Sequence, residues 1–130
     1  MKILPMALIA FLPLLGHAGT WNVVSTRDGD TWKLDADSVK AVTVNGKAMK
    51  QAVVSARFKE VSEDLGKKYD EARTTDVYDR AARTSANREE VLSMAGAPVR
   101  TTSTPDDQLE FIDIFPNTAS ADLAKVICGK

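Results

Sequence analysis

Four aspartates near the start of the chain are the residues best suited to chemistry by type and spacing. They are Asp28, Asp30, Asp35 and Asp37. Carboxylate oxygens bind Ca²⁺ and act as general acids or bases, so the group is a candidate metal site or hydrolase site. The spacing lacks the alternate-residue run ending in a bidentate glutamate that a calcium loop needs, and Asp28-Gly29 is typical of a hairpin turn. The pattern therefore favours turns, and it predicts no metal and no cofactor.

Imidazole chemistry is confined to one residue, His17, which lies in a segment expected to be removed. The rest of the chain has no histidine to act as a general base or metal ligand, and no serine is followed three positions later by lysine. A glycine-rich phosphate loop is also absent. The sequence therefore predicts no catalytic residue and a protein that is not an enzyme. The alternative, a periplasmic carboxylate-dependent hydrolase, rests on the aspartate group.

The first eighteen residues have the pattern of a secretory signal peptide. Lys2 supplies the positive start, residues 3–15 form a short apolar run, and Gly16-His17-Ala18 fits the small-residue cleavage pattern. The apolar run falls short of the roughly 20 residues that cross a bilayer. We therefore expect a signal peptide over residues 1–18, one domain over residues 19–130 with no transmembrane anchor, and a periplasmic or secreted product.

Charge is balanced over the whole chain, with 17 Lys and Arg against 18 Asp and Glu, so nothing indicates nucleic-acid binding. A local excess of positive charge lies between residues 47 and 68. Two interpretations of this basic stretch stay open: a solvated strand face, or a contact surface for an acidic partner. Its cations are Lys47, Lys50, Arg57, Lys59, Lys67 and Lys68.

Cys128 is the only cysteine, so the domain can form no internal disulfide. One interpretation is a small apolar side chain on a helix face near the C-terminus. The other is a free thiol that pairs between two copies of the chain. Cys128 and an exposed sheet edge are therefore the two candidate contacts for a homodimer.

Short apolar runs separated by turn residues follow Trp21, and this pattern predicts an antiparallel sheet of about six strands. Asn45-Gly46 is the strongest turn signal, because both residues tolerate the positive φ of a type I′ hairpin. It is expected to join residues 39–44 to residues 48–58. Other turns are expected at residues 27–30, 97–98 and 105–107.

Two further segments lie outside this simple pattern. Residues 59–68 are charged and include Gly66, so they are predicted to form an exposed loop and a candidate contact surface. Residues 109–115 are predicted to form the last strand, with too many large apolar side chains for a sheet edge.

After Pro116 the apolar residues change to the spacing of one helix face. Thr118 suits the N-cap of this helix, and Gly129 suits its C-terminal stop. The apolar face needs a sheet to cover, so the expected fold class is α+β, a single antiparallel sheet packed by a C-terminal α-helix. The face comprises Ala119, Leu123, Val126 and Ile127.

Several motifs, taken in order, resemble the domain of the bacterial surface-adhesin protein E type. They are Trp21, Leu34-Asp35-Ala36-Asp37-Ser38-Val39, the region 73–83, and Ile114-Phe115-Pro116-Asn117-Thr118 leading to Val126-Ile127-Cys128. Together they span nearly the whole of the expected mature chain. The resemblance implies the same arrangement of sheet and helix, and a binding role. The best-known member of the family holds host matrix and serum proteins at the bacterial surface.

The chain departs from the family pattern in two ways. It has no cysteine for lipid attachment, and Val77 stands where relatives carry the internal cysteine that usually pairs with the one at position 128. We therefore expect an exported, non-enzymatic binding module that contacts a protein or an envelope or extracellular polymer. The alternatives are the hydrolase above and a structural component of an envelope assembly.

Overall fold

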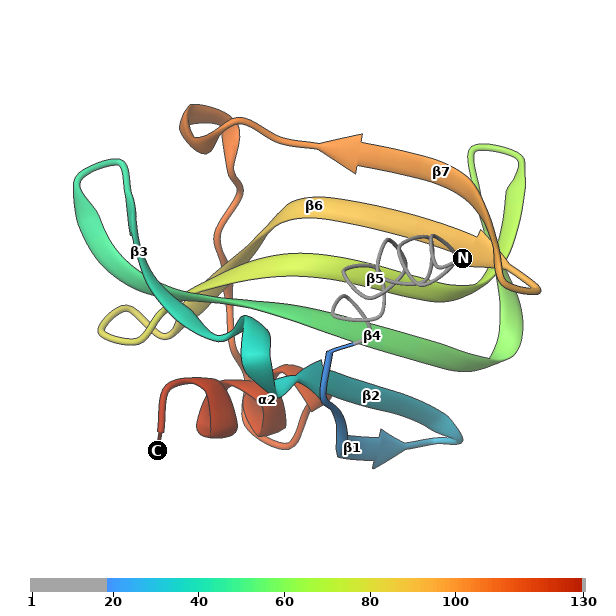
Figure 1. Ribbon diagram of the computed structural model, residues 1–130, viewed down its shortest axis with the longest axis horizontal. Coiled ribbons are helices and arrows are strands. Elements are labelled where there is room, and N and C mark those ends of the chain that lie inside the picture. Colours follow the sequence, from blue (N-terminus) through green and yellow to red (C-terminus); the bar gives the residue numbers. More distant parts are fainter. Residues whose placement is uncertain (1–18, 130) are drawn as a thin grey trace, which may run out of the picture.

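The computed structural model describes residues 19–129, which form one sheet and one α-helix (Figure 1). The predicted α+β class is confirmed, with eight strands rather than about six. The signal peptide predicted over residues 1–18 lies outside the described residues. The elements are β1 (Trp21–Arg27), β2 (Asp30–Asp35), the 3₁₀-helix η2 (Ala36–Ser38), β3 (Lys40–Val44), β4 (Lys47–Asp64), β5 (Lys67–Asp79), β6 (Thr84–Met94), β7 (Ala97–Ser103), the 3₁₀-helix η3 (Asp106–Gln108), β8 (Ile112–Asp113) and α2 (Ala119–Ile127).

All paired strands are antiparallel, in the order β1-β2-β4-β5-β6-β7. Figure 1 shows β4, β5 and β6 side by side through the middle of the sheet, with β1, β2 and α2 below them and β7 above. β3 pairs with the start of β4, and β8 pairs with the start of β6. At 18 residues, β4 is long enough to pair with both β3 and β2 along one edge.

Two-residue turns join the long strands. Asn45 and Gly46 have φ values of 50° and 80°, so the predicted hairpin between β3 and β4 is confirmed. Leu65 and Gly66 have φ values of 50° and 81° and join β4 to β5 in the same way. The predicted loop over residues 59–68 is therefore wrong, because residues 59–64 belong to β4 and residues 67–68 to β5, and the two strands pair from Ser62 to the turn. The sequence does not indicate this turn, because leucine is uncommon at positive φ.

Two other predicted turns have different outcomes. The turn expected at residues 27–30 is confirmed at Asp28-Gly29, where both residues have positive φ. The turn expected at residues 97–98 lies instead at Ala95-Gly96, because Gly96 supplies the positive φ. Pro98 belongs to β7, which is an edge of the sheet and therefore tolerates a residue without an N–H group.

α2 packs on one face of the sheet. Leu123 and Ile127 are its buried residues, and they cluster with Leu34 of β2, Val54 of β4 and Tyr78 of β5. Burying side chains of this size stabilises the fold by about 1.5–3 kcal/mol each. The contact fixes the helix across several strands at once.

The ends of α2 follow the prediction, but one member of its predicted face does not. The Thr118 hydroxyl accepts a hydrogen bond from the Ala121 N–H at 3.2 Å, and Gly129 has a φ of 79° just after the C-cap. Val126 is 55% exposed, so its placement on the apolar face was wrong. It precedes the buried Ile127 by one residue, which turns it about 100° around the helix axis.

The opposite face of β5 carries a second apolar cluster. Adjacent residues of a strand point to opposite faces, so Val77 lies on the other side of β5 from Tyr78. The segment after η3 supplies two of the side chains that cover this cluster. The cluster comprises Val44, Val77 and Ala86, with Val42, Met49, Leu109 and Phe111 packed against it.

The strand predicted over residues 109–115 is mostly wrong. Only β8 within this segment pairs with β6, and Ile112 is 64% exposed. Leu109 and Phe111 pack on the second cluster rather than in a ladder, which explains why the apolar composition resembled that of a buried strand. Among residues 19–129, no helix has the length and apolar character needed to cross a membrane.

Candidate functional site

A groove lies along β6 between the positions where its two short partners pair with it. β8 pairs with β6 at Ser85, and β7 pairs with it from Glu89 onward. Within residues 19–129, Ala86 and Asn87 have no strand partner on this edge. The groove has a volume of about 520 Å³. We call it the β6 groove, and its main polar lining residues are Asn87, Glu89, Glu90, Glu110, Asp113 and Ser120.

Negative charge dominates the β6 groove. Glu89, Glu90, Glu110 and Asp113 line it, and none of the four forms an ion pair with any residue in the part of the chain that the structure describes. A concave surface that carries one sign of charge concentrates the electrostatic field and attracts ligands of the opposite sign. The groove therefore favours a positively charged ligand.

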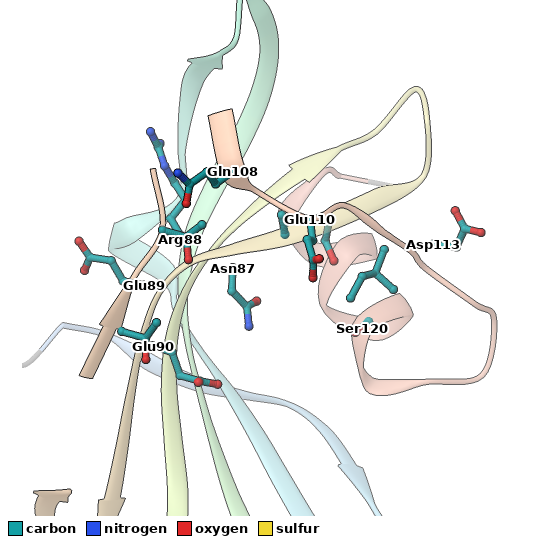
Figure 2. A pocket seen from close by; sticks show the side chains of 13 residues that line it. Asn87, Arg88, Glu89, Glu90, Gln108, Glu110, Asp113 and Ser120 are labelled. Carbon is teal, nitrogen blue, oxygen red and sulfur yellow. The ribbon is translucent and has the colours of Figure 1, made fainter. Parts of the chain in front are cut away.

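The side chains around the groove are not equally placed. Figure 2 shows Glu90, Asn87 and Glu110 extending into the same space, whereas Glu89 and Asp113 lie at opposite margins of the view. Two carboxylates and one amide therefore form the centre of the groove, and two further carboxylates flank it.

A β-bulge shapes β6 beside the groove. Thr75 of β5 lies opposite Glu89, and Asp76 lies opposite Asn87, so Arg88 is an extra residue without a partner in the ladder. Such an insertion bends the strand locally and changes the direction of its side chains. The bulge thus lies between Asn87 on one side and Glu89 and Glu90 on the other.

Arg88 lines the groove, but its charge is engaged elsewhere. Its guanidinium donates to Asp106 Oδ1 at 2.6 Å and to Gln51 Oε1 at 2.8 Å. These hydrogen bonds tie η3 to β6 and β4, and so fix the segment that forms one wall of the groove. They also direct the only cationic side chain of the lining toward Asp106 rather than toward the unpaired carboxylates.

A buried carboxyl lies on the strand next to the groove. Asp76 of β5 is paired with Asn87 and is buried. Burial raises the pKa of Asp76 to about 6, against the effect of hydrogen bonds from Thr74 and Tyr78, and the charge of Glu90 raises the pKa further. Asp76 Oδ1 has no hydrogen-bond partner among the described residues. Asp76 therefore changes charge near pH 6, and it lies close enough to the groove for the charge of Glu90 to affect it.

The chemistry that this arrangement supports is recognition of a cation. Carboxylate and amide oxygens accept charge-assisted hydrogen bonds from ammonium and guanidinium groups. No group of three or more acidic, histidine or cysteine side chains in residues 19–129 is placed to hold a metal ion.

The four aspartates singled out from the sequence are not brought together. Asp28 and Asp30 lie at the β1–β2 turn, whereas Asp35 ends β2 and Asp37 lies in η2, about 16 Å away along an extended strand. Asp30 accepts a hydrogen bond from the Lys59 N–H at 2.8 Å, and Asp35 caps η2 by accepting one from the Asp37 N–H at 3.1 Å. The group maintains local chain geometry and does not form one site.

The basic stretch is also dispersed. Lys47 and Lys59 stand at distant positions on β4, about 40 Å apart along the strand. Lys47 binds Asp79 at 2.7 Å, and Arg57 binds Glu71 at 3.2 Å. The stretch therefore forms no continuous basic surface, and the interpretation as solvated strand positions fits it better.

Cys128 is the C-cap of α2 and is half-buried against the cluster beneath the helix. Burial raises the pKa of its thiol, so the thiol is protonated at neutral pH and packs as a small apolar group. Val77 lies in the cluster on the opposite face of β5. A cysteine at position 77 would therefore not face Cys128.

Sequence reasoning did not find the β6 groove. Its residues come from two segments, residues 85–90 and residues 102–120, which meet only because β7, β8 and the segment between them return to β6. The signal available in the sequence is the excess of acidic over basic side chains in residues 70–90, which does not say where these side chains gather in the fold.

No family model, curated protein or solved structure matches the chain.

Proposed function

We propose that the chain is an exported, non-enzymatic binding module whose β6 groove holds a positively charged segment of a partner protein. The observation that carries this proposal is a set of four carboxylates that have no ion-pair partner among residues 19–129 and that line a groove beside an interrupted strand edge. A ligand that brings lysine or arginine side chains to this groove forms charge-assisted hydrogen bonds that the protein itself does not make.

The shape of the site favours an extended segment. Ala86 and Asn87 lie between the β8 pairing and the β7 pairing, and the Arg88 carbonyl accepts a hydrogen bond from the Thr104 N–H at 2.9 Å, so only one or two residues of an extended peptide can lie beside this edge. Peptides commonly add to exposed strand edges, where the backbone contributes affinity and alternate side chains contribute specificity. Here the alternate side chains would reach Glu90 and Glu110, the central carboxylates.

Export and a binding role are also what the resemblance to the surface-adhesin protein E type implies. We propose cleavage before Gly19 and a final location in the periplasm or outside the cell. The intact mass of the protein isolated from the envelope and medium fractions tests this step. A mass that begins at Gly19 supports export, and an uncut chain confined to the cytoplasm contradicts it.

Of the alternatives, the hydrolase loses its candidate site, because the aspartates of residues 28–37 serve two separate ends of β2. We assign the carboxylates that line the β6 groove to recognition of a cation instead.

Backbone amide shifts measured by NMR test the proposed site directly. We expect a lysine- and arginine-rich peptide to shift the amides of Ala86, Asn87 and Glu110 in a saturable manner. A glutamate-rich peptide of equal length is the control and is expected to leave them unchanged. Equal shifts with both peptides, or shifts confined to other strands, would overturn the assignment of the groove.

A further inference from the structure

A second cavity lies between α2 and the turn that joins β5 to β6, and its charge is opposite to that of the β6 groove. Its volume is about 470 Å³, which is within the range of small-molecule sites. We call it the α2 cavity. The residues that matter for its chemistry are Arg80, Arg83, Lys125, Tyr78, Ile114 and Cys128.

Three cations of the α2 cavity have no carboxylate partner in the part of the chain that the structure describes. Arg80 and Arg83 come from the β5–β6 turn, and Lys125 comes from the last turn of α2. None of them forms an ion pair with a residue between 19 and 129. All three are exposed, so their charges are available to a ligand that enters the cavity.

The two carboxylates that line the α2 cavity are already neutralised. Asp122 accepts from Arg27 Nε at 3.0 Å and from Arg27 Nη2 at 3.2 Å, a two-point contact with the guanidinium. Asp79 is buried and pairs with Lys47 Nζ at 2.7 Å. The cavity therefore presents a net positive field to any ligand.

The turn that carries Arg80 and Arg83 is held in place. Asp79 Oδ1 accepts a hydrogen bond from the Ala82 N–H at 3.1 Å, inside the turn. The Ile114 N–H donates to the Arg83 carbonyl at 2.9 Å and joins the turn to the segment before α2. A turn fixed at two points loses little conformational entropy when a ligand binds, which favours affinity.

One wall of the α2 cavity is apolar. Tyr78, Ile114 and Cys128 contribute to it, and all three belong to or pack against the cluster beneath α2. Arg80 lies close enough to Cys128 for its charge to influence the thiol. The cations and the apolar wall thus face the same space.

We infer that the α2 cavity binds a small organic anion, with its carboxylate or phosphate group at Arg80, Arg83 and Lys125 and its apolar body against Tyr78, Ile114 and Cys128. This site is separate from the β6 groove, and the inference does not depend on the proposed function. Carboxylate and phosphate ligands of this kind have the same two features, one anionic end and one short apolar end.

Cys128 gives a direct probe, because it is the only cysteine in the chain and it lines the cavity. Two methanethiosulfonate reagents of similar size, one bearing a sulfonate and one bearing a trimethylammonium group, measure the local field. The measured quantity is the rate of the sulfonate reagent divided by that of the trimethylammonium reagent. We expect this ratio to be about tenfold higher on Cys128 than on free mercaptoethanol. Arg80→Gln/Arg83→Gln is expected to abolish most of that preference.

The matched control is Lys33→Gln/Lys67→Gln, which removes two exposed lysines that do not line the cavity. It is expected to leave the preference of Cys128 unchanged. If both double variants behave like the wild type, or if both lose the preference equally, the cavity has no special field and the inference fails.

Occupancy is tested by protection of Cys128 from neutral iodoacetamide. Octanoate and octyl phosphate are expected to slow alkylation in a saturable manner, whereas octanol is not, and Arg80→Gln/Arg83→Gln is expected to remove the protection. Protection by octanol as well, or by phosphatidylglycerol vesicles alone, would overturn the assignment to a small organic anion. Absence of protection by both anions would do the same.

Discussion

Arg27 of β1 and Asp122 of α2 lie 95 residues apart in the chain, yet Arg27 Nη2 and Asp122 Oδ2 are 2.9 Å apart. The Ser25 hydroxyl donates to the same Asp122 Oδ2 at 2.7 Å. The contact joins the first strand to the first turn of the last helix, beside the apolar cluster that α2 covers. It sets the position of α2 along the sheet, and hence the shape of the α2 cavity.

Asp122→Asn is expected to weaken the attachment of α2. The hydrogen bond from Ser25 and the charge of Arg27 hold the pKa of Asp122 below its usual range, so the folded state favours the ionised form. This stabilisation is present above the unfolded pKa and is lost as the pH falls through the folded pKa. We expect faster amide exchange in α2 and a lower melting temperature at pH 7. The exposed Asp107→Asn is the control, and equal effects of the two variants would contradict the role of Asp122.

Asp76→Asn is expected to flatten the dependence of stability on pH. The pKa of Asp76 rises from 3.8 to about 6 in the folded state, so the folded protein binds the proton more tightly than the unfolded chain. Protonated Asp76 therefore adds about 3 kcal/mol to the free energy of unfolding below pH 3.8. This stabilisation is lost as the pH rises through about 6.

Urea unfolding between pH 4 and 7 checks the sign of this effect. The wild type is expected to lose stability over this range relative to Asp76→Asn, and Asp107→Asn is expected to follow the wild type. If stability rises with pH equally in all three proteins, Asp76 is not the group that titrates.

Thr118→Ala is expected to lower the free energy of unfolding by about 1 kcal/mol, because it removes the N-cap of α2. The lost bond is the one from the Ala121 N–H to Thr118 Oγ1. Thr118→Ser keeps the hydroxyl and is expected to retain most of the stability. Equal losses in both variants would show that the methyl group, not the cap, is responsible.

Leu65→Asn is expected to stabilise the β4–β5 hairpin by roughly 0.5–1 kcal/mol, because asparagine adopts the left-handed conformation at lower cost than leucine. Leu65 has a φ of 50° and is 79% exposed, so the substitution gives up little packing. Chemical unfolding measures the free energy of unfolding of Leu65→Asn and of Leu65→Ala. Both variants remove the exposed leucine side chain, but only asparagine favours the left-handed backbone conformation. A gain in the alanine variant as large as in the asparagine variant would contradict the turn argument.

Elements defined by local chemistry could be predicted from the sequence. The turn preference of Asn45-Gly46 lies in two adjacent residues. The helix α2 is indicated by the spacing of Leu123 and Ile127 and by the N-cap at Thr118. In each case the determining interactions span only a few positions of the chain.

Features that depend on pairing between distant segments could not be predicted. Leu65 has no preference for a turn, and the pairing of β4 with β5 on both sides of it imposes the left-handed conformation. Leu109 and Phe111 resemble strand residues but pack over the second cluster. The β6 groove has the same origin, because Glu90 and Glu110 meet only after residues 102–113 return to β6.

Whether the β6 groove recognises positive charge is tested most directly by its affinity for a lysine- and arginine-rich peptide. Isothermal titration calorimetry compares the wild type with Glu90→Gln/Glu110→Gln, which removes the two central charges, and with Glu60→Gln/Glu63→Gln, which removes two exposed charges from β4. We expect the groove variant to bind at least about tenfold more weakly, and the β4 variant to bind like the wild type. Equal affinity in all three proteins, or no binding by the wild type, would contradict it.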